Sequence, residues 1–276
     1  MSRLSSEVTF GADPEFFIFD PATSRRVPAW EFTKGTKENH EAVPGMKGID
    51  MHADGVAVEF NLPPSPAKNF HRELYRAFSH FRGLVSIKGW QISNSCIETD
   101  FDAKSLMHPL ALRSGCDPDF CAYNEDVTEE RPPLKFTPTL PRFAGGHIHI
   151  GYPTEYLPRH ALIKMIEGLW RSQYIYRDSQ GDRQKFYGRA GTFRPKSYGV
   201  EYRSPSNYWL FGDYDDISSF TSYVISIFDK LQDRPGPLND WYQAARWNVL
   251  QEALNGTDNA ACEKIANEIL MSYKQV

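Results

Sequence analysis

The sequence predicts an α+β fold in which a mainly antiparallel sheet carries helices packed on its outer face. Segments that alternate between apolar and polar residues, as strands do, dominate up to about residue 62 and return at residues 145–151 and 199–204. Amphipathic segments with helical spacing lie between and after them, and residues from about 215 to 276 have helical patterns alone. Neither internal repeats nor low-complexity segments interrupt this order.

Four of the strand-like segments have one apolar face and one face of charged or metal-binding side chains. These second faces carry the pairs Asp13–Glu15, Glu59–Asn61, His147–His149 and Glu201–Arg203. The solvent face of an antiparallel sheet would explain any one pair alone. Solvent faces usually mix Lys, Thr, Ser and Glu, however, and two like charges side by side cost energy unless a cation lies between them. The four pairs together therefore predict a site that binds several metal ions.

Helical segments and one long loop account for most of the remaining chain. The segment Pro63–Pro66 ends the early strands, and Ser65 is the expected N-cap of a helix over residues 66–87. Residues 99–144 contain six prolines and little periodicity, which predicts a long ordered loop over the site. The other expected elements are a strand at 90–97 and helices at about 158–178, 216–232, 239–254 and 258–273, the last with Thr257 as N-cap.

Composition indicates a globular protein that acts on small molecules. A chain of 276 residues with 41% hydrophobic content can bury a full core, and we expect one catalytic domain over residues 1–276 with a helical part at about 215–276. The net charge of −4 predicts no general binding to nucleic acid or membrane, and it leaves a homo-oligomer open. Because the first six residues lack an apolar signal region and no stretch reaches membrane-spanning length, the expected location is the cytoplasm.

The cysteines agree with a reducing compartment. The chain has four of them, Cys96, Cys116, Cys121 and Cys262, and they form no CxxC motif. Cys116 and Cys121 could pair across a loop, but we expect scattered free thiols.

Residues 182–203 combine interleaved glycines with a local excess of positive charge. Arg183, Lys185, Arg189, Arg194, Lys196 and Arg203 stand against only Asp182 and Glu201, an excess of four positive charges. Glycine allows close backbone approach and arginine binds phosphate bidentately, so we interpret the segment as phosphate-binding, with a solvated basic loop as the alternative. Carboxylates that hold Mg²⁺ beside arginines that hold phosphate indicate nucleoside triphosphate chemistry.

These motifs resemble those of glutamine synthetase and occur in the same order. The segment Ala12–Asp20 resembles that family's first metal-binding strand, where two glutamates have the same i, i+2 spacing. Gly145–His149 resembles its His-x-His strand, and Val200–Arg203 resembles its Glu-x-Arg strand. The block Asp54–Pro64 is more similar to the glutamate–cysteine ligase branch. The whole pattern most resembles the type 2 carboxylate–amine ligases encoded by tailed phages, although the chain has no counterpart of the small N-terminal domain of the synthetase.

The resemblance implies a glutamine-synthetase-like curved sheet and an ATP-dependent ligase reaction. A substrate carboxylate would attack the γ-phosphate of ATP to give an acyl phosphate, and an amine would then displace phosphate to form an amide or peptide-like bond. The implied cofactors are ATP and Mg²⁺, with Mn²⁺ as a substitute. The implied partners are small-molecule or peptide acids and amines, and a phage-encoded chain would act in the host cytoplasm.

The resemblance also assigns roles to residues. His147 corresponds to the histidine that binds metal, whereas His149 would contact substrate or nucleotide, with a core role as an equal alternative. Asp13 stands where the synthetase has a longer glutamate, so its metal is expected to sit differently or to bind more weakly. The implied metal ligands are Asp13, Glu15, Glu59, His147 and Glu201. The implied nucleotide-binding residues are Arg194, Lys196, Arg203 and His149, and the implied catalytic residues are Arg203, Arg189 and Arg194.

Three questions stay open at the level of sequence. Asp50, His52 and Asp54 alternate in the same sense and would serve amine binding or deprotonation, but a turn role for Asp54–Gly55 is equally compatible. A zinc or two-metal hydrolase would also use His-x-His with carboxylates, although it would not need the arginine cluster. A non-catalytic phage protein that keeps the ligase fold would be expected to lose site residues, and here only Asp13 departs from the pattern.

Overall fold

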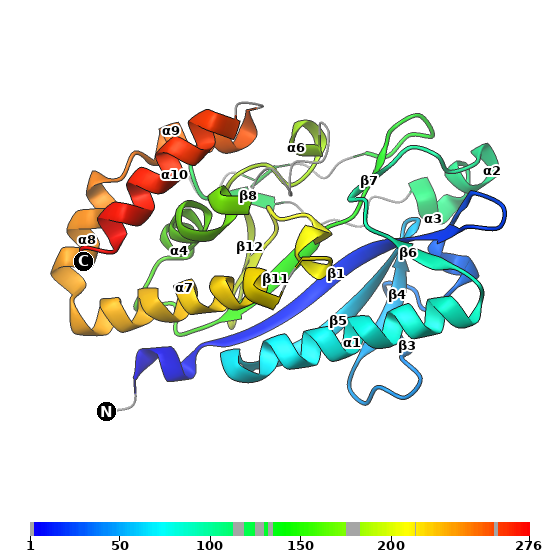
Figure 1. The fold of residues 1–276 in the computed structure, drawn as a ribbon, viewed down its shortest axis with the longest axis horizontal. Helices are drawn as coiled ribbons and strands as arrows, with labels where there is room; N and C mark the ends of the chain where they lie inside the picture. Colours follow the sequence, from blue (N-terminus) through cyan, green and yellow to red (C-terminus); the bar gives the residue numbers. More distant parts are fainter. Residues whose placement is uncertain are drawn as a thin grey trace.

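The computed structural model describes residues 3–112, 119–124, 130–131, 135–174, 183–212, 214–256 and 259–276 (Figure 1). Within these ranges one large sheet contains eleven strands, and all of their pairings are antiparallel. Its main path is β3 (Glu41–Ala42), β4 (Asp50–Asp54), β5 (Ala57–Pro66), β1 (Thr9–Asp20), β11 (Gly146–Gly151), β13 (Gly199–Tyr202), β12 (Thr192–Lys196), β8 (Asp119–Cys121) and β9 (Glu130–Arg131). The prediction of an α+β fold with a mainly antiparallel sheet is confirmed.

Strand β1 organises the sheet because its two halves pair with different neighbours. Its first half lies between β5 and β11, whereas its second half pairs with β2 (Arg25–Val27) and β6 (Gln91–Ser93). A separate two-stranded sheet joins β7 (Ile97–Glu98) to β10 (Arg142–Phe143). This pairing brings the segment before β11 against the loop after β6.

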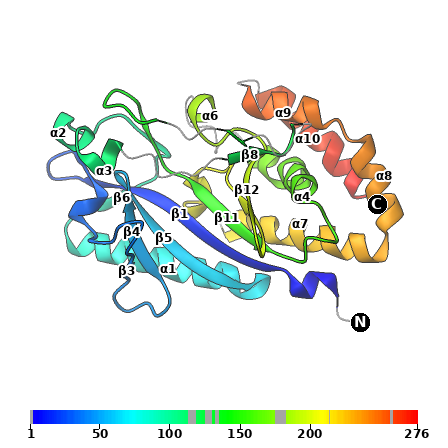
Figure 2. The same ribbon diagram turned by 180° about the vertical axis from the view of Figure 1, so that it is seen from behind.

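Two long helices cover one face of the sheet. Helix α1 (Ala67–Ile87) and helix α7 (Tyr214–Asp233) lie on the same side, and the strands pass in front of them in the reverse view (Figure 2). The apolar stripe predicted for α1 is buried: Phe70, Leu74, Ala77, Phe78, Phe81 and Val85. Even-numbered residues of β1 face these helices, as the contact between Phe10 and Phe70 shows, with ring centroids 5.8 Å apart. Asp13 and Glu15 therefore face the other side.

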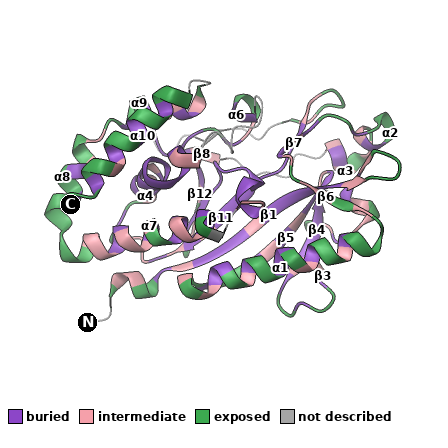
Figure 3. Cartoon of the chain, in the orientation of Figure 1, coloured by how far each residue is buried: buried purple, intermediate pink, exposed green. Residues whose placement is uncertain are grey.

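The remaining helices pack at the two ends of the sheet. α4 (Arg159–Ile166) continues into the π-helical turn η3 (Glu167–Arg171), and α8 (Pro235–Ala244), α9 (Trp247–Asn255) and α10 (Asn259–Tyr273) close the C-terminal end. The short elements are η1 (Leu4–Glu7), η2 (Ala29–Glu31), α2 (Ala103–Leu106), α3 (Pro109–Leu112), α6 (Arg183–Phe186) and η4 (Asn207–Leu210). Figure 3 shows that the central strands are buried along most of their length, whereas the outward faces of α8 to α10 are exposed.

Two local predictions in the first half are wrong. Ser65 does not cap α1, because Pro66 occupies the N-cap position and the Ser65 hydroxyl is buried without a hydrogen-bond partner among the described residues. The strand expected at 90–97 is two short strands, β6 and β7. Ser95 separates them, since its hydroxyl bonds both the amide and the carbonyl of Ile97 and holds the chain in a local turn.

The later helices also differ from expectation. The helix expected at 239–254 is two helices, because Ala245 adopts an extended backbone and ends α8. Helix α8 begins at Pro235, four residues before the expected start at about 239, since proline suits the first turn of a helix. Residues 99–144 are not only a loop, because α2, α3, β8, β9 and β10 form within the described parts. The helix expected at 158–178 is described only as far as residue 174.

Some expectations fall outside the described residues. Cys116 and Thr257 belong to that group, so the pairing of Cys116 and the capping by Thr257 are not tested. Cys96, Cys121 and Cys262 are buried, and none of them forms a disulfide bond within the described part of the chain. Among the helices that the structure describes, none has both the length and the apolar character needed to cross a membrane.

Aromatic packing under β1 and β5 predicts a large cost for cavity formation. Phe81 is fully buried on α1, with its ring centroid 4.6 Å from that of Phe60 and 5.6 Å from that of Phe16. Substitution F81A should lower the free energy of unfolding by roughly 3–5 kcal/mol, measured by urea denaturation. The control Y75A, on the same helix at 66% exposure, should change it by less than about 0.5 kcal/mol. Similar values for the two variants would contradict this packing.

Candidate active site

The registers of neighbouring strands bring the predicted polar faces together on the side of the sheet opposite α1. Directly opposed residues in an antiparallel pair have Cβ atoms about 4.5–5.5 Å apart, so their side chains meet. The opposed pairs are His52 and Glu59, Glu59 and Glu15, Asp13 and His147, His149 and Glu201, and Glu201 and Arg194. Six adjacent strands thus place one row of ionisable groups across the sheet.

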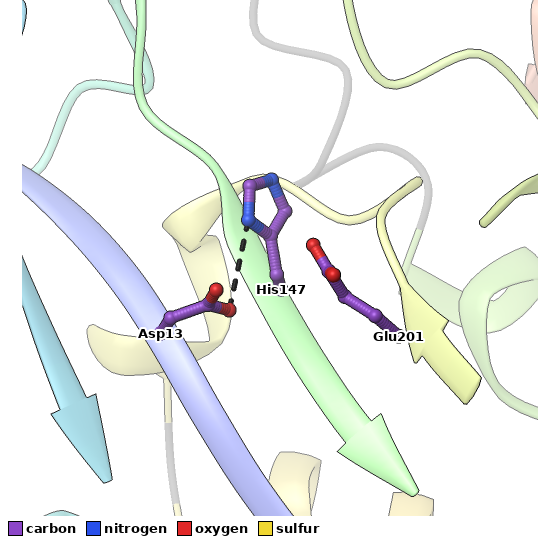
Figure 4. Close-up of side chains that lie close together, drawn as sticks. All are labelled: Asp13, His147 and Glu201. Carbon is purple, nitrogen blue, oxygen red and sulfur yellow. Dashed lines mark ion pairs between the residues drawn. The ribbon is translucent and has the colours of Figure 1, made fainter. Parts of the chain in front are cut away.

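The first cluster consists of Asp13, His147 and Glu201, which point toward one another from β1, β11 and β13 (Figure 4). One ligand atom from each lies within 4.8 Å of the others, and Asp13 Oδ1 is 3.6 Å from His147 Nδ1. Burial and the nearby Arg203 guanidinium hold the pKa of His147 well below its usual value. A neutral imidazole beside two carboxylates is a set of groups that can coordinate a divalent cation.

Glycine is required where β11 begins. A side chain at Gly146 would place its Cβ 2.2 Å from the carbonyl oxygen of Ser206, so the strand could not approach η4 as it does. The indole of Trp209 donates to the Gly146 carbonyl at 3.1 Å and fixes the same segment. These contacts determine where the neighbouring His147 enters the site.

The second cluster consists of Glu15, Asp54 and Glu59, whose ligand atoms also lie within 4.8 Å of one another. Asp54 ends β4 just before Gly55, which has a positive φ of 58° and forms the turn into β5. The two sequence interpretations of Asp54 are therefore not exclusive, because the turn that it begins also carries its carboxylate into this cluster. Asp54 was not among the predicted metal ligands. The alternation of Asp50, His52 and Asp54 along one strand is the sequence pattern that could have identified Asp54 as a site residue.

The second cluster has a strong excess of negative charge. Burial, followed by the charge of Asp54, raises the pKa of Glu15 to about 8, although the Gly145 amide donates to Glu15 Oε2 at 2.9 Å. Burial and the charges of Asp13, Asp54 and Glu15 raise the pKa of Glu59 well above its usual value. Burial also raises the pKa of Asp54. Three acids in this state fit a hard divalent cation, whose oxygen ligands and positive charge would remove the repulsion.

The first cluster, by contrast, is bordered by cations. Arg203 is buried and donates to Glu201 through Nη1, and its Nε lies 2.9 Å from Asp119 Oδ1. Lys196 Nζ lies 2.7 Å from Glu201 Oε2, and Arg194 Nε lies 3.0 Å from Asp119 Oδ1. Burial alone would raise the pKa of Glu201, but the Arg203 guanidinium and its neighbours hold it far below the usual range. Arg194, Lys196 and Arg203 are therefore gathered at one end of the site.

The other basic residues of the segment lie elsewhere. Arg189 is exposed, and its main-chain carbonyl accepts from the amide and hydroxyl of Thr192 and from the hydroxyl of Ser204. Arg183 is fully buried and donates to the carbonyls of Ser204 and Pro205, so it supports the backbone beyond β13. The phosphate-binding assignment of Arg189 remains a prediction.

His149 is paired with acid rather than packed in the core. Its Nε2 lies 3.1 Å from Asp13 Oδ1, and its Nδ1 forms a hydrogen bond with the Tyr198 hydroxyl. Burial would lower the pKa of His149, but Asp13 more than offsets this and raises it. His149 therefore reinforces the position of Asp13 and keeps a polar side toward the site.

Sequence reasoning missed Asp119 and Tyr187. Asp119 forms ion pairs with Arg194 and Arg203, and it lies on β8, a strand inside the segment expected to be a loop. The Tyr187 hydroxyl forms a hydrogen bond with His147 Nε2 at 2.8 Å and accepts one from Arg203 Nη2 at 3.0 Å. It therefore supports the ring nitrogen of His147 that faces away from Asp13, and a partner of this kind orients a metal-binding histidine. No spacing pattern pointed to either residue.

A buried ion pair holds the turn that follows Tyr187. Glu167 and Arg171, both with 0% exposed surface, lie on the π-helical turn η3 with 3.1 Å between Glu167 Oε1 and Arg171 Nη1. Both carboxylate oxygens of Glu167 accept from the Gly191 amide at 2.9 Å, and Arg171 donates to the Gly188 carbonyl at 3.0 Å. The turn over residues 188–191 is thereby fixed from inside the protein.

Comparison with known proteins gives matches among solved structures alone. No family model matches the chain, and no curated protein matches its sequence. Among solved structures, the chain is similar to two structures of GmaS, a gamma-glutamylmethylamide synthetase. The structure of GmaS without ligand has 12% sequence identity and a TM-score of 0.39, with 98% of this chain and 70% of that chain covered. The complex of GmaS with ADP has 12% identity, a TM-score of 0.36 and the same coverage.

The raised pKa values predict that acid stabilises the metal-free protein. An unfolded glutamate ionises near its ordinary pKa of 4.5, whereas folded Glu15 retains its proton up to about pH 8. Below about pH 6.5 the lowered pKa of His147 acts in the opposite sense, because an unfolded histidine takes up a proton there. In EDTA the free energy of unfolding should therefore fall as pH rises from about 6.5 to 8, by more than about 1 kcal/mol because one pKa unit corresponds to about 1.4 kcal/mol. Urea denaturation at a series of pH values measures this trend.

Substitution D54N provides the matched test, since it removes one of the three charges. At pH 8 in EDTA this variant should be more stable than the parent, and it should gain less from added Mg²⁺ or Mn²⁺. The control E252Q, at an exposed position of α9, should behave like the parent. A pH-independent stability in EDTA, together with no effect of D54N, would contradict the repulsion described here.

Proposed function

We propose that the protein is an ATP- and Mg²⁺-dependent carboxylate–amine ligase that forms an amide or peptide-like bond through an acyl phosphate. The observation that carries this proposal is the coincidence of two clusters of metal-binding groups with Arg194, Lys196 and Arg203 at one end of the same row. Metal ligands alone suit hydrolysis, but metal ligands beside a cationic phosphate site suit phosphoryl transfer. The motif order that resembles glutamine synthetase supports the same class of reaction.

Each group of residues has a separate task in this proposal. Asp13, His147 and Glu201 would hold one divalent cation, and Glu15, Asp54 and Glu59 would hold another. When bound, these cations would supply charge neutralisation for the transferring phosphoryl group. In the free protein Lys196 and Arg203 neutralise Glu201, and Arg194 pairs with Asp119. With the carboxylates neutralised, these cationic side chains would be available for phosphate oxygens.

The buried guanidinium of Arg203 is the group best placed to respond to charge that develops during transfer. Its position is fixed by Glu201, Asp119 and Tyr187, so binding phosphate would require little reorganisation. Asp119 and Glu201 also keep the guanidinium charged and oriented. The acid and amine substrates would be small molecules or peptides, and the reaction would take place in the cytoplasm, that of the host for a phage-encoded chain.

Hydroxylamine trapping tests the reaction class. With ATP, Mg²⁺ and a pool of carboxylic acids, the protein should release ADP and convert hydroxylamine into a hydroxamate, because an acyl phosphate reacts readily with this amine. EDTA should stop the reaction, and Mg²⁺ or Mn²⁺ should restore it better than Zn²⁺, since oxygen-rich sites favour hard cations. Cleavage of an amide or ester without nucleotide, restored best by Zn²⁺, would instead establish a metal-dependent hydrolase.

Substitution R203K tests the role of the guanidinium. Lysine keeps the positive charge but loses the planar fork, so turnover of ATP should fall by roughly a hundredfold or more. Nucleotide affinity, measured by calorimetry, should fall less, because the fork mainly serves charge that develops during transfer. The exposed R189K is the matched control, and a small effect there would show that Arg189 acts outside the transfer step. Parental turnover in R203K would make Arg203 a structural residue.

A further inference from the structure

His40, Asp50 and Asn61 are three side chains that the proposed reaction does not use, and we call them the loop triad. Asp50 and Asn61 are directly opposed on β4 and β5, and His40 lies in the loop just before β3. His40 Nδ1 is 2.9 Å from Asp50 Oδ1 and 3.0 Å from Asn61 Nδ2. Asn61 Nδ2 is in turn 2.6 Å from Asp50 Oδ1. The three atoms therefore form a compact triangle in which each is close to both of the others.

Hydrogen bonds cannot satisfy all three contacts while Asp50 is ionised. If His40 Nδ1 carries a proton, it faces a second donor in the amide nitrogen of Asn61. If it carries none, its lone pair faces the lone pairs of Asp50 Oδ1. Turning the Asn61 amide instead brings two acceptor oxygens together. One contact is thus repulsive in every arrangement of the hydrogens.

A divalent cation would remove this conflict. With its amide turned, Asn61 presents Oδ1, and three lone pairs from His40, Asp50 and Asn61 then point to one position. Two ligand atoms about 2.1 Å from a metal ion and at right angles to each other lie about 3.0 Å apart. The observed separations of 2.6, 2.9 and 3.0 Å are close to those along one face of such an octahedron. The side chains of His40 and Asp50 are 33% and 43% exposed, which leaves room for water at the other positions.

The loop that carries His40 is fixed against β4 by its backbone. The Gly35 carbonyl accepts from the Ala53 amide at 3.0 Å. A side chain at Gly35 would place its Cβ 2.2 Å from the Met51 carbonyl oxygen, so only glycine allows this close approach. The path of the loop is therefore set before any ion binds.

The ring of His40 is fixed as well. It stacks on the ring of His52, with 4.3 Å between the centroids and 4° between the planes. His52 is buried and its Nε2 lies 3.7 Å from Glu59 Oε2, so the stack rests on the wall of the second cluster. Ligands that are already in place lose little conformational freedom when an ion binds.

We propose that the loop triad is a binding site for a divalent transition-metal ion, which ties the loop before β3 to β4 and β5. A histidine nitrogen suits Zn²⁺ or Ni²⁺, whereas the three carboxylates of the second cluster suit Mg²⁺. The two sites are distinct, because Asn61 and Glu59 share a strand face about 7 Å apart. Figure 2 shows β3 to β5 at the end of the sheet away from α8 to α10. The proposal does not depend on the ligase function.

Nitrogen-15 NMR of the histidine rings tests whether His40 becomes a ligand. With Mg²⁺ in excess to occupy the second cluster, Zn²⁺ should shift the Nδ1 resonance of His40, which H40Q identifies by its absence. The control H80Q removes a histidine of α1 that bonds the Pro44 carbonyl, and it should leave the shifted resonance in place. A Zn²⁺ response confined to other histidines would overturn the proposal.

Substitution N61D distinguishes a metal site from a network of hydrogen bonds. A second carboxylate in the triad should tighten Zn²⁺ binding by roughly tenfold or more in calorimetry, because ligand charge raises cation affinity. In EDTA the same variant should melt at a lower temperature than the parent, since two carboxylates then face each other. A network of hydrogen bonds alone would give the lower melting temperature without tighter binding.

Substitution D50N gives the opposite change at the same site. Loss of the charged ligand should weaken Zn²⁺ binding by roughly 10- to 100-fold, the range seen even for outer-shell partners of a metal. Circular dichroism verifies folding of both variants, and the NMR experiment on the parent decides the outcome if either does not fold. Unchanged Zn²⁺ affinity in folded D50N, or unchanged or weaker affinity in folded N61D, would overturn the proposal.

Discussion

Repulsion among buried carboxylates is the constraint on which this site depends. Glu15, Asp54 and Glu59 come from three adjacent strands, and burial and the charges of neighbouring acids raise the pKa of each of them. The sheet holds them in place because their opposite faces belong to the aromatic core against α1. The stability of the rest of the fold therefore offsets the repulsion among these acids. A bound cation would reduce that repulsion and stabilise the folded protein.

The two ends of the polar row differ in how far cationic side chains neutralise their carboxylates. At the second cluster the acids have only partial compensation, whereas at the first cluster Arg203 and Lys196 lie against Glu201. A carboxylate that is already paired keeps a low pKa and remains ionised at neutral pH. This asymmetry suits a reaction in which a cation and an anionic phosphate group bind side by side, since each needs a partner of opposite charge.

Support for these groups comes from a second layer that is largely internal. Glu167 and Arg171 fix the 188–191 turn, Tyr187 links His147 to Arg203, and η4 closes on the start of β11. Buried ion pairs of this kind contribute little to the net free energy of unfolding. Removing one partner is nevertheless strongly destabilising, because the other charge is left buried and unpaired. Their effect here is to restrict the positions of side chains that would otherwise rotate, as preorganised sites require.

The sequence alone determined the polar faces of four strands, the stripe of α1 and the antiparallel class of the sheet. Alternation and helical spacing are local properties of the sequence. The residues next to Glu15 and Phe81 are therefore enough to predict which face of the strand or helix each of them occupies. Tertiary structure alone decided which strands are adjacent, and with that the entry of Asp54 into a cluster and of Asp119 beside Arg203. It also decided the break at Ala245 and the contact of Tyr187 with His147. These features arise from contacts between segments far apart in the chain, and local spacing does not encode such contacts because many strand orders satisfy the same periodicity.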